Sequence, residues 1–211
     1  MMLEAPGRQA IYEWLRRFRF LATWRILCVA VSSMAVLGIG CEGRGHDESP
    51  VPFPSLTVEC AGAVNAGVDQ VVLECPASSQ ELVELHVMIG GPTTSIDIYG
   101  AKFDLVFDST VLRFEPPAIE GSFLNADGQS TLLESEINSQ DPNRLVVGIT
   151  RAATAGGVQG AAGEQRIMTL LFRAIQSGNT DVALDNAEAV DSDLVVVPSV
   201  RFIGPIGIEV R

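Results

Sequence analysis

The chain has 211 residues, of which 47% are hydrophobic, and a formal net charge of −12. Five of its 14 basic residues but only two of its 26 acidic ones lie in the first 40 positions, so the remainder carries 9 basic and 24 acidic residues, a charge of −15. Such a surface repels phosphate backbones and retains no basic cluster, which excludes nucleic acid as a partner. Neutral or basic partners are expected.

The N-terminal region has the pattern of a secretory signal peptide. Several arginines precede an apolar run of about 14 residues, which is shorter than the roughly 20 residues of a membrane-spanning helix. We therefore predict that residues 1–40 form a signal segment and that the protein is exported.

The residues before Cys41 suggest how the exported protein is held. Leu37-Gly38-Ile39-Gly40-Cys41 resembles a bacterial lipobox, in which small residues precede a cysteine that becomes lipidated and forms the new N-terminus. Gly38 stands where that motif usually has leucine, and an uncleaved leader acting as the anchor is the alternative. We expect the protein to be a membrane-anchored lipoprotein of the bacterial cell envelope, located at the outer membrane or on the periplasmic face.

Residues 41–55 and 56–81 are predicted to precede the main domain. The first segment is polar, contains three prolines and reads as a flexible tether. In the second, Cys60 and Cys75 are expected to form a disulfide, since an exported chain favours oxidation; two reduced, buried thiols are the alternative. We expect residues 56–81 to be a strand-loop extension packed on the domain.

From Leu82 onward, apolar residues alternate with polar ones. Val83, Leu85, Val87 and Ile89 share one face of an expected strand, and Phe103, Leu105 and Phe107 do the same further along. Short strands separated by Gly, Pro and Asp indicate an all-β fold in which two antiparallel sheets pack face to face over residues 82–211. The other expected strands are 111–114, 145–150, 167–175, 181–184, 194–197, 200–203 and 206–210.

Three segments resemble the cohesin family. They are Phe103–Phe114, an aromatic-rich strand that ends in Asp before a turn and Val-Leu; Gly163–Arg173, a glycine followed by a strand with Thr, Leu and Phe; and Ala187–Asp193, which precedes the closing strands. The resemblance implies a nine-stranded jelly-roll sandwich, shared with carbohydrate-binding modules, that binds dockerin modules or related ligands. It transfers no partner-binding residues, because the family's binding surface carries no motif of its own.

Catalysis is not expected. The only histidines are His46, in the tether, and His86, which we place on the solvent face of a strand, so a histidine-based triad or metal site lacks parts. Paired carboxylates such as Asp104 and Asp108 could support glycoside hydrolysis, but acids on an outward strand face are usually there for solvation.

Calcium is the remaining cofactor to consider. Asp185, Asn186, Glu188, Asp191 and Asp193 fall in one expected loop, and hard cations bind several oxygen ligands. The spacing does not match a calcium-binding loop, so a polar turn is the favoured interpretation and no cofactor is predicted; Asp185, Asp191 and Asp193 stay as weak calcium candidates.

The predicted function is a non-catalytic envelope module that holds a dockerin-like or other protein partner at the membrane surface. One alternative is a carbohydrate-binding module linked to polysaccharide breakdown, but both tryptophans lie in the leader and Tyr99 is the only tyrosine after it, which leaves few rings for stacking on sugars. Another alternative is a structural envelope lipoprotein without a specific ligand.

Overall fold

The computed structural model describes residues 56–61, 65–76, 78–79, 81–91, 97–152, 156–159 and 163–211. Cys41, the predicted signal segment and the predicted tether lie outside these ranges. All regular secondary structure in the described residues is β-strand. These residues contain no helix that is long and apolar enough to cross a membrane. The predicted all-β fold is confirmed.

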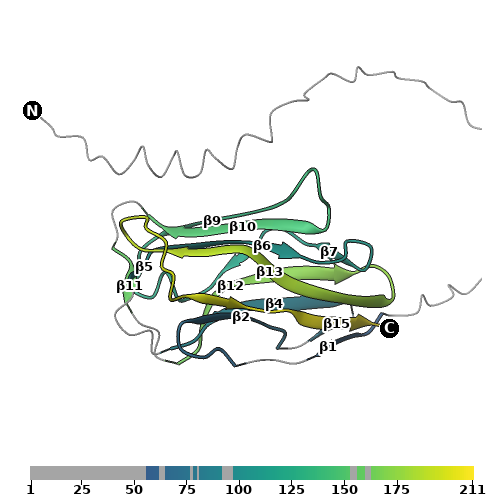
Figure 1. Ribbon diagram of the computed structural model, residues 1–211. Helices are drawn as coiled ribbons and strands as arrows, with labels where there is room; N and C mark the ends of the chain where they lie inside the picture. The colour runs from purple at the N-terminus through teal and green to yellow at the C-terminus, as the bar shows by residue number, and fades with distance from the viewer. Residues whose placement is uncertain are drawn as a thin grey trace, which may run out of the picture.

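One layer is a six-stranded sheet with the order β1-β15-β13-β6-β10-β9, in which neighbouring strands are antiparallel (Figure 1). Its strands are β1 (Val58–Ala61), β6 (Gly100–Val106), β9 (Thr131–Ile137), β10 (Arg144–Arg151), β13 (Gly178–Val190) and β15 (Ile206–Val210).

The second layer is a seven-stranded sheet with the main order β14-β2-β4-β12-β7; β3 also pairs with β4, and β8 with β12. Its strands are β2 (Gln70–Glu74), β3 (Ser78–Ser79), β4 (Leu82–Ile89), β7 (Leu112–Phe114), β8 (Ile119–Glu120), β12 (Gln165–Ala174) and β14 (Arg201–Ile203). The pairing of β14 with β2 is parallel, and all other pairings are antiparallel. A small separate pair joins β5 (Asp97–Ile98) to β11 (Val158–Gln159).

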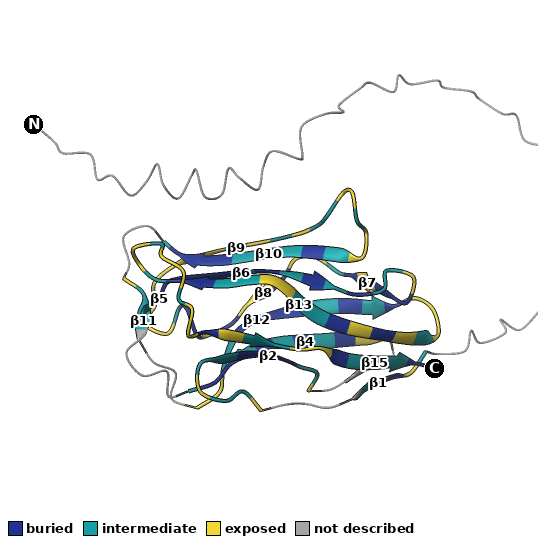
Figure 2. Ribbon diagram, in the orientation of Figure 1, coloured by how far each residue is buried: buried dark blue, intermediate teal, exposed yellow. Residues whose placement is uncertain are grey.

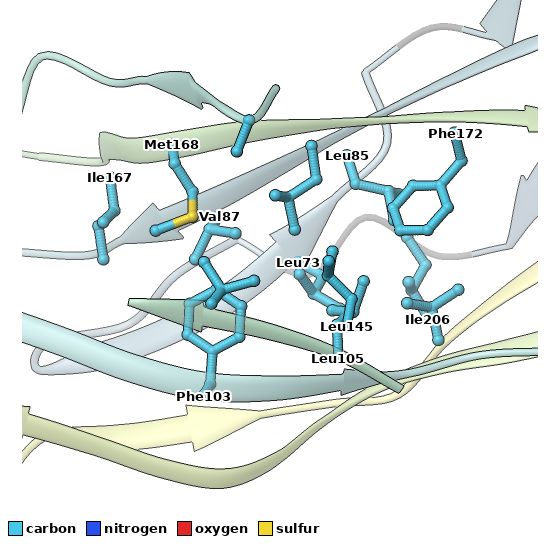
Figure 3. Packing of buried hydrophobic residues seen from close by; sticks show 14 of the residues in the cluster. Leu73, Leu85, Val87, Phe103, Leu105, Leu145, Ile167, Met168, Phe172 and Ile206 are labelled. Carbon is cyan, nitrogen blue, oxygen red and sulfur yellow. The ribbon is translucent and has the colours of Figure 1, made fainter. Parts of the chain in front are cut away.

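The hydrophobic core lies between the two sheets. Phe103 and Leu105 of β6 point inward from one layer, and Leu85 of β4 and Phe172 of β12 point inward from the other (Figure 3). Each of these side chains is at most 1% exposed. The alternation that predicted the strands therefore reflects real burial, because successive strand residues point to opposite faces.

The strands β1 and β2, which come from the segment 56–81, are part of the sandwich itself rather than an addition to its surface. β1 pairs with β15 at the edge of the six-stranded sheet, whereas β2 lies between β4 and β14 in the other sheet. A disulfide joins Cys60, in β1, to Cys75, directly after β2, with the Cα atoms 6.2 Å apart. The bridge therefore links one sheet to the other.

Three local expectations differ from the structure. Residues 131–137, which we did not assign, form the edge strand β9. The loop expected over residues 185–193 is wrong for its first part, since β13 continues to Val190, whereas residues 191–193 lie in a turn as expected. The strand expected at 194–197 is also wrong: this segment is a loop that contributes one isolated bridge, Val190 to Val196, and Leu194 has a positive φ of 61°.

Candidate binding surface

The outer face of the six-stranded sheet is rich in carboxylates. We call it the acidic face, and Figure 2 shows exposed and half-buried positions along its strands. Strand alternation and cross-strand register place eight acidic and three basic side chains on or beside it. The acidic residues are Glu59, Asp104, Glu134, Glu136, Asp181, Asp185, Glu188 and Glu209, and the basic ones are Lys102, Arg144 and Arg211.

Arg144 organises the centre of the acidic face. Its Nη1 atom donates to Asp104 Oδ2 at 2.7 Å and to Asp185 Oδ2 at 2.9 Å, which joins β10 to β6 and β13. The Asn186 side-chain amide also donates to Asp104 Oδ2, at 2.7 Å. Three strands that are distant in sequence thus share one polar cluster.

A β-bulge makes the Asn186 contact. Asp185 pairs with Asp104 and Glu188 pairs with Lys102, so β13 has one more residue than β6 over this interval. Asn186 takes a left-handed φ of 48°, a conformation that asparagine tolerates better than most residues. The bulge turns the Asn186 side chain toward the neighbouring strand.

Charge pairing shifts the pKa of two groups in this cluster. The hydrogen bond from Arg144 lowers the pKa of the Asp185 carboxyl, with a smaller contribution from the Asn186 backbone N–H. The pKa of Arg144 is raised by the same bond to Asp185 and then by the bond to Asp104. The ion pair between Asp185 and Arg144 therefore keeps both of its charges at neutral pH and into the acidic range.

The remaining carboxylates of the acidic face divide into paired and unpaired groups. Lys102 pairs with Glu188 at 2.9 Å, and Arg211 pairs with Glu209 and Glu59. In the described part of the chain, Asp181, Glu134 and Glu136 form no ion pair. Spare negative charge therefore lies on both sides of the Arg144 cluster.

Small aliphatic side chains lie among these charges. Val106, Val146 and Ala183 are half-buried and face outward, with Val106 directly across from Ala183. Leu132, on the edge strand, is 44% exposed. Aliphatic groups ringed by charge are suited to protein association, where an apolar centre is desolvated and a polar rim stays in contact with water.

The outer face of the seven-stranded sheet has a different character. Arg173 bridges Glu115 at 3.1 Å and Glu81 at 3.2 Å, and Arg113 also pairs with Glu115. His86 faces outward, as predicted, but its side chain is only 16% exposed and its Nε2 atom lies 2.7 Å from Glu84 Oε1. Arg113 and Arg173 thus neutralise Glu115 and Glu81, and this face has a smaller excess of negative charge than the acidic face.

The calcium candidates do not form a site. Asp185 lies within β13 and is bound by Arg144, whereas Asp191 and Asp193 lie in the turn beyond the strand. Asp191 Oδ1 accepts the backbone N–H groups of Asp193 at 3.0 Å and Val195 at 2.8 Å, so it serves the turn. The described ranges contain no group of three His, Cys, Asp or Glu residues arranged to hold a metal ion.

The acids considered for glycoside hydrolysis have separate structural roles. Asp104 is bound by Arg144 and Asn186. Asp108 accepts from the backbone N–H and the hydroxyl of Thr110, and these bonds lower the pKa of its carboxyl. An acid catalyst at neutral pH requires a raised pKa, so Asp108 is unsuited to that task.

Aromatic rings are not displayed for sugar stacking. Tyr99 is 3% exposed, and burial raises the pKa of its hydroxyl. Among the phenylalanines of the described residues, Phe202 is half-buried and the others are buried in the core. Stacking on a polysaccharide therefore has no ring to use in this part of the chain.

Sequence reasoning placed Asp104 on the outer face of its strand but missed the cluster around Arg144. The outward position of Asp104 follows from the local alternation of Phe103, Leu105 and Phe107 along the chain. The cluster around Arg144 depends on the register of three strands and on the bulge at Asn186, and no local pattern predicts these.

No protein-family model matches the chain, and no curated protein matches it in sequence. Its fold is similar to that of solved cohesins of Acetivibrio cellulolyticus. The second type II cohesin module of the adaptor ScaA scaffoldin has a TM-score of 0.52 at 12% identity, over 68% of this chain and 89% of that one. A type II cohesin domain from the cellulosome has a TM-score of 0.50 at 14% sequence identity, over 67% of this chain and 93% of that one.

A third similar structure is a type II cohesin–X-dockerin complex, an N-terminal interface mutant, from the same organism. It gives a TM-score of 0.50 at 11% identity, over 64% of this chain and 96% of the matched chain. At these identities the likeness is one of fold. The sandwich therefore has a cohesin-like fold, as the sequence resemblance predicted.

Proposed function

We propose that the protein is a non-catalytic binding module of the cell envelope that holds a protein partner, dockerin-like in character, on its acidic face. The observation that carries the proposal is the contrast between this face, with its unpaired carboxylates around small aliphatic groups, and the face of the other sheet, where arginines and glutamates are closer to balance. The cohesin-like fold supports a protein partner, because one structure of this fold contains a dockerin.

The chemistry of the face indicates the chemistry of the partner. Asp181, Glu134 and Glu136 would attract a basic surface, while Val106, Val146 and Ala183 offer an apolar centre to cover. Complementary charge mainly accelerates association and suppresses wrong partners, and the buried centre provides the affinity. Binding should therefore weaken as salt concentration rises.

Two matched variants test the proposal. Val146→Arg places a bulky cation at the centre of the acidic face, and Leu171→Arg makes the same kind of change at a half-buried, outward-facing position of β12 on the opposite face. Titration calorimetry with a panel of dockerin modules measures the affinity of each. We expect saturable binding that falls at least about a hundredfold in Val146→Arg and is unchanged in Leu171→Arg.

Equal losses in the two variants, or a loss only in Leu171→Arg, would place the binding surface elsewhere. If no dockerin module binds, the dockerin part of the proposal fails. The remaining alternatives would then be another protein partner or a structural envelope lipoprotein without a ligand.

The envelope location belongs to the same proposal and rests on the sequence around Cys41. At the start of the described chain, the Thr57 N–H donates to the Arg211 carbonyl at 2.9 Å, so a tether leading to Cys41 would leave from the end of the sandwich that carries the C-terminus. Metabolic labelling with a fatty acid tests the anchor. Incorporation that is abolished in Cys41→Ala supports it, and an unlabelled wild-type protein contradicts it.

A further inference from the structure

Among the described residues, one row of backbone groups along the edge strand β9 has no hydrogen-bond partner. The Asn138 N–H donates to the Arg144 carbonyl, and the Ala152 N–H donates to the Ser130 carbonyl, each at 2.8 Å. Bonded and non-bonded pairs alternate in an antiparallel ladder, so the even-numbered residues between these points bond to β10. The N–H and C=O groups of the odd-numbered residues therefore point away from the sheet. We call this row the open edge: Thr131, Leu133, Ser135 and Ile137.

The open edge lacks two common protections against strand pairing. β9 contains no proline, and its register with β10 runs from Thr131 to Ile137 without a bulge. The other outermost strands of the two sheets in the described part of the chain are shorter: β1 has four residues, β7 and β14 have three each, and β3 and β8 have two each. β9, with seven, is the longest edge presented to another chain.

The side chains along the open edge select by charge. Glu134 and Glu136 are exposed on the acidic face, and Leu132 beside them is 44% exposed. Neither glutamate has an ion-pair partner among the described residues. A guest strand would place alternate side chains on this same face, next to these carboxylates.

This charge arrangement disfavours a second copy of the chain as the guest. Two β9 strands paired antiparallel would bring Glu134 and Glu136 of one copy against the same residues of the other, and like charges in cross-strand positions are destabilising. A guest with lysine or arginine at every second position meets complementary charge instead.

We infer that the open edge of β9 is a docking site for an extended, basic segment of the protein partner, which adds to the six-stranded sheet as a further strand. The inference rests on the proposed function and deepens it by naming the chemistry of the partner segment. Backbone bonds to the odd-numbered residues supply affinity, and contacts with Glu134 and Glu136 supply selectivity.

The probe is a blocked heptapeptide in which lysine alternates with valine. An isomer with its lysines contiguous has the same charge and composition, and an N-methylated version lacks the N–H groups needed to bond along one edge. All three are titrated against the unmodified protein, so this comparison does not depend on how a variant folds. We expect the isomer and the N-methylated peptide to bind at least about tenfold more weakly.

Amide hydrogen exchange locates the bound peptide. In the free protein, the N–H groups of Leu133, Ser135 and Ile137 should exchange quickly, while those of Glu134 and Glu136 are protected by β10. The alternating peptide should slow exchange at the odd-numbered positions selectively. Protection elsewhere, or at none of these positions, overturns the inference.

Two pairs of variants separate backbone pairing from charge. Ser135→Pro removes one edge N–H and should weaken peptide binding roughly tenfold, while Ser135→Ala keeps the N–H and serves as its control. The double variant Glu134→Gln with Glu136→Gln should weaken binding about fivefold, whereas Glu59→Gln with Glu209→Gln, at the opposite edge of the same face, should not.

The results also separate this inference from the proposed function. Equal binding of the three peptides, or binding insensitive to Ser135→Pro, means attraction by charge alone and overturns the strand-addition site. If Val146→Arg still abolishes dockerin binding in that case, the partner docks on the acidic face without using the open edge. If the peptides behave as expected while no protein partner binds, the proposed function fails and the strand site remains.

Discussion

The two outer faces of this sandwich share one core but differ in how they treat charge. On the seven-stranded sheet, four arginines and six glutamates lie on or beside the face, and Arg113 and Arg173 form ion pairs with Glu115 or Glu81. On the six-stranded sheet, eight carboxylates face three basic groups, and Asp181, Glu134 and Glu136 lack an ion pair among the described residues. The acidic face therefore has the larger excess of carboxylates, five against two on the other face.

This difference shows that the charges on an outer face vary independently of the fold. Core side chains such as Leu85 and Leu105 require only that each strand alternate, and they place no demand on which charges lie outside. The proposed binding therefore depends on a few outward residues and not on the sandwich itself. The predictions below probe first the shared core and the link between the sheets, and then each face.

Phe172→Ala should have the largest effect, because it removes packing on which both faces depend. Its ring is fully buried, with centroids 5.0 Å from Phe107 and 5.5 Å from Phe114. We expect a loss of about 3–5 kcal/mol in the free energy of unfolding, measured by urea denaturation. Phe202→Ala, at a half-buried ring, is the control and should cost clearly less. Equal losses would mean that the core is not the common support described here.

Removing the disulfide should come next in size. Cys60 and Cys75 are 15 residues apart, and closing a loop of that length contributes about 3 kcal/mol in the chain-entropy model. The double variant Cys60→Ser with Cys75→Ser should lose stability by about that amount, measured by thermal unfolding. Peptide binding at β9 should be unchanged below the melting temperature, because β9 lies at the far edge of its sheet. An unaltered melting temperature would contradict the predicted link.

Arg144→Ala should change the acid sensitivity of the acidic face. The bond from Arg144 lowers the pKa of Asp185, so the stability it gives is present above the ordinary Asp range and is lost as pH falls through the lowered pKa. In the variant, the pKa of Asp185 should return toward about 3.9, measured by NMR titration.

Arg113→Ala is the matched change on the opposite face. The pKa of Glu115 is lowered by hydrogen bonds from Arg113 and then from Arg173, so Arg173 should keep it lowered in the variant. A pKa of Asp185 that does not move in Arg144→Ala would refute the central role of Arg144.

Glu74→Gln should have the smallest effect, and it should be favourable. The pKa of Glu74 is raised, first by desolvation and then by repulsion from Glu164, while His86 opposes the shift. A carboxyl whose folded pKa is raised destabilises the fold once it ionises, so the amide should be slightly more stable at pH 7, within about 0.5 kcal/mol. Melting curves at pH 4 and pH 7 test this. A larger gain at pH 4 than at pH 7 would contradict the cause.

Local pattern predicted much of the sandwich from sequence. Val83, Leu85 and Val87 alternate with polar residues, and each is buried as expected. The edge strand β9 was not predicted because Leu132 and Leu133 are adjacent, and two successive apolar residues obscure the alternation of a half-exposed strand. Residues 194–197 misled in the opposite direction, since their apolar run resembles a strand, but Leu194 adopts a left-handed backbone.

The binding surface was less predictable than the fold for a physical reason. Arg144, Asp104 and Asp185 are neighbours only because β10, β6 and β13 pair in one particular register. The open edge of β9 likewise depends on which residues bond to β10. Such relations are set by long-range pairing, whereas burial on one face of a strand is set by local alternation.

Lys102 offers the most direct test of the acidic face, because it is the only lysine in the chain and lies at the centre of that face beside Glu188. Mass spectrometry can follow reductive methylation of its amine with and without a saturating dockerin module. We predict that bound partner slows this modification severalfold, by covering the face. An unchanged rate at saturation would contradict the claim that the partner binds there.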